Sequence, residues 1–129
     1  MNYEGVIIEE SLEDKSVLKD VRILSTKVEP VTEKHKTPWL KQWTLHTVLI
    51  PEDEAEVIAE RISGALDSEH PWYADFKNDT THFIIFRGKV FEVDRTKKEE
   101  YAAAMEYGIS LGIPKYQVDF ALNAKVWKR

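Results

Sequence analysis

The four histidines of this 129-residue chain are the side chains best suited to metal binding or acid–base chemistry. His46 and His82 fall in segments that we expect to form strands, whereas His35 and His70 fall in expected loops. No two of them have the helical i,i+4 or close-loop spacing typical of zinc ligands, and the chain has no cysteine to complete such a site. We therefore expect no metal and no cofactor, and we interpret the histidines as structural or surface residues.

A small enzyme that uses His46, His82 or Asp75 is one alternative function. General acid–base catalysis needs an imidazole or a carboxylate whose surroundings hold its pKa near the working pH. The serines lack the context of a nucleophile elbow, and the five glycines lack the spacing of a phosphate-binding loop. We therefore assign no catalytic residue from the sequence.

Nucleic-acid binding through residues 34–43 is a second alternative, because basic and aromatic side chains are interleaved there. Such side chains can neutralise phosphates and stack on bases. The residues that would make these contacts are Lys34, Lys36, Trp39 and Lys41. The net charge of -5 argues against a polyanionic partner. Trp43 falls on the apolar side of an expected strand, so we place it in the core.

Our first interpretation is a non-catalytic module that binds a small ligand or a protein partner. The chain carries four Trp, five Tyr and five Phe, and no motif in it indicates catalysis. Binding sites are mostly apolar with a few polar groups, and a loop that folds over the sheet would bring such a mixture together. The candidate binding residues are Trp39, His46, Trp72, Tyr73 and Asp75.

The elements that position these side chains are clearest in the second half of the chain. Residues 72–77 alternate between apolar and polar side chains, which is typical of a strand. Asn78 begins a turn, and residues 82–87 and 89–94 form a hairpin joined through Gly88, which can adopt the positive φ that such turns need. These three strands form a meander.

The first half predicts a second unit of the same order. Strands are expected over 5–10, over 21–31 with a bulge or bend, and over 42–50, followed by a helix that begins at Pro51. A capping box at 96–99 predicts the start of the last helix. We therefore expect an α+β fold: an antiparallel sheet of about six strands, made of two β-β-β-α blocks, with two main helices packed on one face.

Length and composition predict one domain over residues 1–120, followed by a mobile basic tail over 121–129. The lack of cysteine suits a reducing cytoplasm, and we see neither a signal peptide nor an apolar run that could span a membrane. We therefore expect a cytoplasmic protein with no membrane partner. An edge strand, over 5–10 or 21–31, could pair with a second copy to form a homodimer.

Four short segments carry a resemblance to a known family. They are Tyr3–Ile7 (YEGVI), Glu10–Leu12 (ESL), Glu106–Pro114 (EYGISLGIP) and Asp119–Phe120 (DF). With these segments the chain resembles a family of small uncharacterised prokaryotic α+β proteins with no assigned function, over most of residues 3–120. The resemblance implies a small cytoplasmic protein, and it implies no activity and no site residues.

Overall fold

The computed structural model describes residues 1–35 and 37–118 of the chain. This part forms three strands and a helix twice over, with short 3-10 turns between them. The main elements are β1 (Tyr3–Ile8), β2 (Arg22–Pro30), β3 (Gln42–Ile50), α1 (Ala55–Ala65), β4 (Tyr73–Lys77), β5 (Thr81–Phe86), β6 (Lys89–Asp94) and α2 (Lys98–Ser110). The predicted α+β class and its two β-β-β-α blocks are confirmed.

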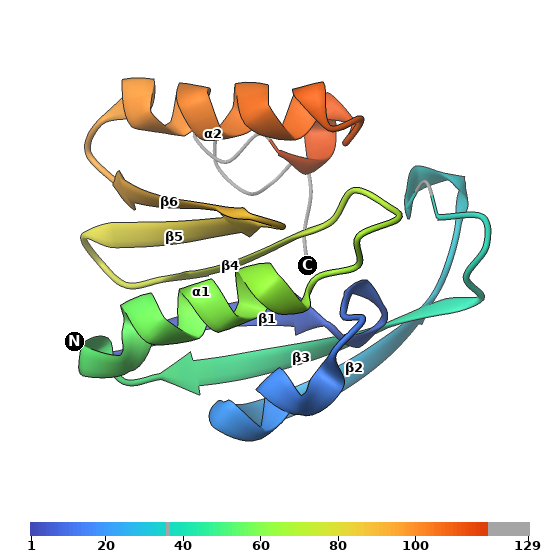
Figure 1. The fold of residues 1–129 in the computed structure, drawn as a ribbon, viewed down its shortest axis with the longest axis horizontal. Coiled ribbons are helices and arrows are strands. Elements are labelled where there is room, and N and C mark those ends of the chain that lie inside the picture. Colours follow the sequence, from blue (N-terminus) through green and yellow to red (C-terminus); the bar gives the residue numbers. More distant parts are fainter. Residues whose placement is uncertain (36, 119–129) are drawn as a thin grey trace.

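The strands of the described residues form one antiparallel sheet in the order β2-β3-β1-β4-β5-β6 (Figure 1). The first strand of each block lies at the centre, because β1 pairs with β3 on one side and with β4 on the other. The outer strands are β2 and β6. Of the two segments considered as edge strands, 21–31 does contain an outer strand. The alternative over 5–10 is wrong, because β1 is paired on both sides.

Helix α1 packs on the sheet face formed by every second residue of β4 and β5. Ile58 and Ile62 lie one turn apart, so they share one side of the helix. They belong to the same buried cluster as Phe76 of β4 and Phe83 of β5. Pro51 and the acidic 3-10 turn after it lead into α1, as the sequence predicts.

Helix α2 packs on the other face of the sheet. Its Tyr101 belongs to a second buried cluster with Ile84 and Phe86 of β5. Ile84 follows Phe83 directly, and successive strand residues point to opposite faces. The two helices therefore cover opposite faces, which differs from our expectation of both on one face. The physical reason is that β5 is buried along all but its first residue, so other elements must pack on both of its faces.

Two loops lie at the same end of the sheet, on the right in Figure 1. One loop, over 31–41, joins β2 to β3, and the other, over 66–72, joins α1 to β4. Within the described residues, no helix has both the length and the apolar character needed to cross a membrane. The tail predicted over 121–129 lies outside the described residues, so the domain boundary at residue 120 stays a prediction.

Candidate functional site

Hydrogen bonds on two sides anchor the loop over 31–41. On one side, His35 Nε2 lies 3.0 Å from Glu29 Oε1 of β2. On the other, Thr37 Oγ1 accepts a 2.9 Å hydrogen bond from the indole Nε1 of Trp43. Trp43 is 2% exposed, which confirms the prediction that it belongs to the core. The loop is therefore fixed both to the outer strand and to the core.

The loop over 66–72 is held against the segment that follows β1. The backbone N–H of Asp67 donates to Ser11 O at 2.8 Å. The backbone N–H of Ser68 donates to Glu13 Oε1 at 2.9 Å. These bonds satisfy backbone groups that no strand or helix pairs, so the loop has a defined position although it lacks regular structure.

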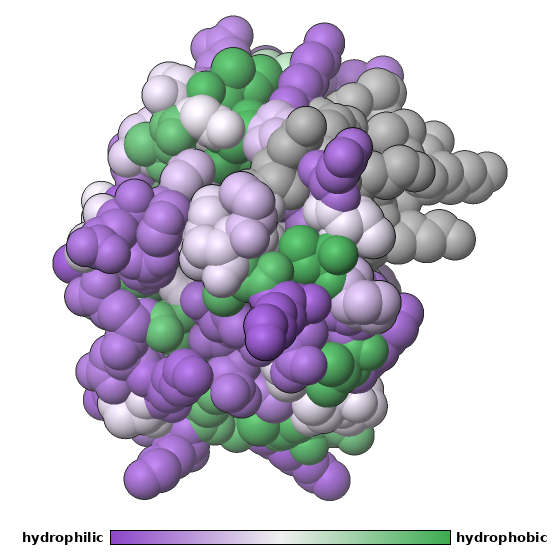
Figure 2. Space-filling view, turned by 90° about the vertical axis from the view of Figure 1, so that its right-hand side faces the viewer, coloured by the Kyte–Doolittle hydropathy of each residue, from purple (hydrophilic) through white to green (hydrophobic). Residues whose placement is uncertain are grey.

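The two loops meet where the indole of Trp39 stacks on the imidazole of His70. The ring centroids lie 3.8 Å apart and the ring planes differ by 17°. Trp39 nevertheless remains 46% exposed, and the His70 side chain remains 34% exposed. Figure 2 looks onto this end of the molecule, and in its coloured part the hydrophobic side chains form separate groups among hydrophilic ones. This aromatic pair is therefore partly exposed to solvent, at an end of the molecule whose surface is largely polar.

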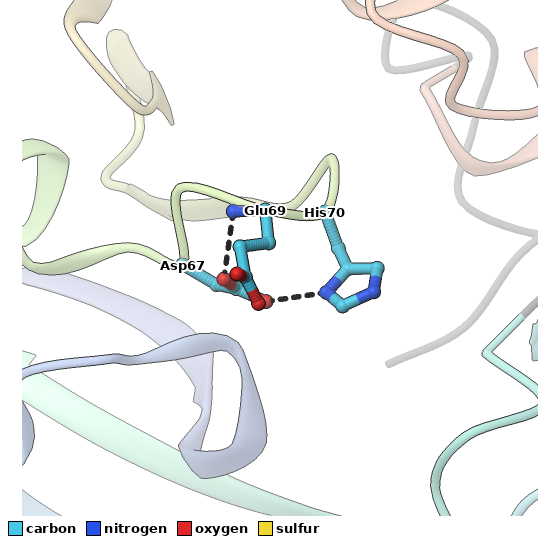
Figure 3. A group of neighbouring side chains, drawn as sticks. All are labelled: Asp67, Glu69 and His70. Carbon is cyan, nitrogen blue, oxygen red and sulfur yellow. Dashed lines mark hydrogen bonds and ion pairs between the residues drawn. The ribbon is translucent and has the colours of Figure 1, made fainter.

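The carboxylate of Asp67 holds His70 in place (Figure 3). His70 Nδ1 lies 2.8 Å from Asp67 Oδ2, and the backbone N–H of Glu69 donates to Asp67 Oδ1 at 2.9 Å. The Glu69 carboxylate lies close by, since one oxygen or nitrogen atom from each of the three side chains lies within 4.8 Å of the others. We refer to Trp39, Asp67, Glu69 and His70 together as the Trp39–His70 corner.

Electrostatics at the corner favour negative charge on Asp67. Burial of Asp67 opposes ionisation, but the hydrogen bonds from the Glu69 N–H and from His70 outweigh it and hold the pKa of Asp67 below its usual 3.8. Near neutral pH, Asp67 is therefore an anion that accepts the proton of His70 Nδ1. His70 Nε2 makes no hydrogen bond to another of the described residues, which leaves this nitrogen to a ligand that approaches the corner.

The same side chains include the donor set of a metal site. Two carboxylates and an imidazole nitrogen can ligate a divalent transition metal. An ion would have to displace the proton on His70 Nδ1, and bonds of about 2.1 Å would draw the three donor atoms closer together. Histidine and cysteine spacings alone do not reveal this group in the sequence. The available signal is the run Asp67-Ser68-Glu69-His70 within one loop.

Replacing Asp67 with asparagine is expected to remove a pH-dependent part of the stability. The pKa of Asp67 is lower in the folded chain than in the unfolded one, so its ionised form stabilises the fold above the unfolded pKa of about 3.8. That contribution is lost as the pH falls through the folded pKa. Urea unfolding at a series of pH values should show the wild type and Asp67→Asn converging in acid. A stability difference that stays constant from neutral to strongly acid pH would contradict the account.

His46 lies away from the corner, on β3. Its Nε2 lies 2.9 Å from Glu9 Oε1, its Nδ1 lies 2.9 Å from Thr26 Oγ1, and the residue is 7% exposed. The hydrogen bond from His46 is the main cause that lowers the pKa of Glu9. Both ring nitrogens therefore tie β3 to its surroundings, and the structure does not bring His46 to the other candidate binding residues.

His82 and Asp75, named with His46 in the enzyme hypothesis, do meet. His82 Nε2 lies 2.7 Å from Asp75 Oδ2, and Nδ1 lies 3.0 Å from the hydroxyl of Tyr101. Burial raises the pKa of Tyr101, so its hydroxyl keeps its proton and can donate to Nδ1. His82 is only 4% exposed. Strand alternation places it on the face under α2 and His46 on the opposite face, so these two histidines share no site.

Trp72 and Tyr73 are buried, at 6% and 7% exposure. The Trp72 ring lies 5.5 Å from that of Trp43, and the Tyr73 hydroxyl donates to Gln117 O at 2.5 Å. Both line a cavity of about 10 Å³, which has room for about one water molecule. Of the five candidate binding residues, Trp39 is therefore the exposed one, and it lies at the corner.

The basic residues of the nucleic-acid alternative gain little support from the described part of the chain. Lys36 and the side chain of Lys34 lie outside it, and Lys41 is exposed. Trp39, the aromatic residue of that hypothesis, stacks on an imidazole that is bonded to a carboxylate. A phosphate that approached this ring would meet like charge.

An open hollow of about 450 Å³ lies beside the N-terminal end of α2 and is lined mainly by polar side chains. Asp94 Oδ1 accepts hydrogen bonds from N and Oγ1 of Thr96, and Glu100 Oε1 accepts one from Asp94 N. These carboxylates satisfy the chain's own backbone, so their presence in the hollow is explained without a ligand.

Comparison of the chain with protein-family models, with curated proteins and with solved structures finds no match. The resemblance to small prokaryotic proteins therefore stays a prediction. The function is inferred from the geometry alone.

Proposed function

We propose that this chain is a non-catalytic binding module, and that the Trp39–His70 corner recognises a basic side chain, lysine or arginine, of a protein partner. The observation that carries the proposal is the exposed indole of Trp39, stacked on an imidazole that an ionised carboxylate holds in place. The proposal retains the cytoplasmic location expected from the lack of cysteine.

The chemistry of the corner complements a cation. The face of an indole attracts ammonium and guanidinium groups, and an arginine can stack on the ring while its fork binds a carboxylate. Asp67 and Glu69 place two carboxylates beside the aromatic pair. The rest of the chain favours the same partner, since its net charge of -5 attracts basic segments over a longer range.

The shape of the corner favours a side chain of a protein over a free small molecule. Small ligands are held in cavities of about 300–1,000 Å³ that enclose most of their surface. Trp39 stands 46% exposed on a loop, and the nearby cavity against Trp72 has a volume of about 10 Å³. A partner protein can supply the remaining contact area on both sides of such a corner.

The test is a binding titration with a short Gly-Ser peptide that carries one arginine. The matched probe is the same peptide with citrulline, which keeps the shape and removes the charge. We expect weak binding of the arginine peptide and weaker binding of the citrulline peptide. Higher salt should also weaken binding of the arginine peptide. Trp39→Leu and Glu69→Gln should each weaken binding by about threefold to tenfold, whereas Trp39→Phe, which keeps an aromatic face, should retain most of it.

The control is Glu60→Gln, which removes an exposed carboxylate from α1 and leaves the corner intact. Equal weakening by Glu60→Gln and Glu69→Gln would mean that the acidic surface as a whole attracts the peptide, and would refute a specific corner. Equal affinity for the arginine and citrulline peptides would refute recognition of a cation. Titrations repeated in the presence of a chelator should give the same affinities, because the proposed contact needs no metal.

A further inference from the structure

The outer strand β2 is the most open strand of the described sheet. Every one of its nine residues is exposed except Glu29, which is partly covered. Three of the exposed residues are large and apolar: Ile23 at 41%, Leu24 at 45% and Val28 at 54%. A long outer strand with exposed apolar side chains is a template for pairing with another strand.

The hydrogen-bond pattern shows which backbone groups of β2 face away from the sheet. Val28 pairs with Thr44 of β3, and the N–H of Thr44 donates to Glu10 Oε1 on the far side of that strand. Val31, three residues further on, donates to Lys41 O at 3.0 Å. In an antiparallel pair, bonded and non-bonded positions alternate, so the N–H and C=O of Val28 point outward.

The remaining residues of the strand agree with this assignment. Thr26 and Pro30 have the same parity as Val28, so they also point their backbone groups outward. Proline lacks an N–H and is tolerated in an outer strand where that group would face solvent. A bulge between Ile23 and Ser25 ends the regular stretch on the other side. The outward donors and acceptors are therefore concentrated around Val28.

The sequence around Val28 is complementary to itself. An antiparallel pair related by a two-fold axis through Val28 places this residue opposite its own copy. It also places Lys27 of each copy opposite Glu29 of the other copy. Lys27 has a 76% exposed side chain that already lies 3.8 Å from Glu29 Oε2 of its own strand. Opposite charges directly across two strands stabilise the pair.

We propose that β2 pairs antiparallel with β2 of a second copy, about a two-fold axis at Val28, so that one sheet continues through both copies. Val28 then contributes apolar contact at the axis, and the Lys27–Glu29 pairs fix the register. The arrangement is closed, because each copy uses the same strand and the bulge stops further pairing along it.

The test is the sedimentation of the full chain over a range of concentrations. We expect a reversible dimer with twice the 15.0 kDa mass of the chain. Val28→Lys should weaken the dimer by at least about tenfold, because like charges would face each other at the axis. Val57→Lys on α1 is the matched control, because Val57 is also 54% exposed, and it should leave the dimer unchanged.

The register has a test of its own. Val28→Lys and Val28→Asp should each dimerise at least about tenfold more weakly than the wild type, and an equimolar mixture of the two should recover the dimer, because opposite charges then meet at the axis. A wild-type chain that stays at 15.0 kDa at all concentrations would overturn the proposal. A dimer that Val28→Lys does not weaken, or that Val57→Lys weakens equally, would overturn it as well.

Discussion

Replacing Gly5 with alanine is expected to destabilise the fold severely. Gly5 lies in β1 at the centre of the sheet, opposite Phe76 of β4. A Cβ atom at this position would collide with the backbone oxygen of Asp75 and would come within 2.5 Å of the Cα of Phe76. Backbone atoms in paired central strands cannot move aside singly, so we expect a loss of about 3 kcal/mol or more. Urea unfolding followed by tryptophan fluorescence measures it.

The chain contains a matched control for this prediction. A Cβ atom added to Gly64 of α1 would meet no atom within 4 Å. Alanine in a helix loses less conformational freedom on folding than glycine, so Gly64→Ala should raise the stability by about 0.5–1 kcal/mol. If Gly5→Ala and Gly64→Ala have similar effects, the close approach of β1 to β4 described here is wrong.

Replacing His82 with leucine is expected to destabilise the fold by about 2–4 kcal/mol. The imidazole is 4% exposed and bonds both to Asp75 on the neighbouring strand and to Tyr101 of α2. Leucine would leave a carboxylate and a hydroxyl without this partner in a partly buried setting. Smaller losses are expected for Asp75→Asn, which keeps an oxygen acceptor, and for Tyr101→Phe, which removes only the hydroxyl. Thermal and urea unfolding of the three variants should show this order.

This prediction separates the structural interpretation of His82 from the enzyme hypothesis. A catalytic histidine should be replaceable without loss of stability, at the expense of some turnover. A structural histidine that connects two strands and a helix should not be replaceable without loss of stability. An unchanged free energy of unfolding in His82→Leu would contradict the structural interpretation and would return His82 and Asp75 to the list of catalytic candidates.

Local patterns in the sequence were sufficient to predict the elements. Alternation of apolar residues predicts β4 to β6, and the hairpin turn confirms the role of Gly88, whose φ is +74°. The change of apolar parity in β2 predicts its bulge between Ile23 and Ser25. These features depend on backbone preferences and side-chain period, which a single segment carries by itself.

Two features were not predictable in the same way, one of them local and the other dependent on distant residues. The capping box expected at 96–99 is wrong, because Thr96 donates to Asp94 instead, and α2 begins at Lys98 with no side-chain cap. The opposite placement of the two helices depends on which face of β5 each helix reaches. Both faces of that strand are apolar, so the sequence pattern allowed either arrangement.

The site was only partly predictable for the same reason. The sequence indicates Trp39 as a candidate, and the structure places it on His70, a loop residue that the sequence favours as a structural or surface histidine. The carboxylates of the corner lie in a loop without periodicity, and only the contact between two loops places them beside an aromatic pair. His46 and Asp75 have the right chemistry, but their hydrogen-bonding partners Glu9 and His82 already engage them.

The measurement that tests the central claim most directly is an NMR titration of the isotope-labelled chain with N-acetylarginine amide. The account predicts that the indole Nε1 signal of Trp39 and the backbone amides of residues 67–70 shift together with one common affinity. Signals from the acidic N-terminal part of α1 and from the turn over 52–54 should stay in place. Shifts confined to that acidic segment, or no shifts at the corner at all, would contradict the account.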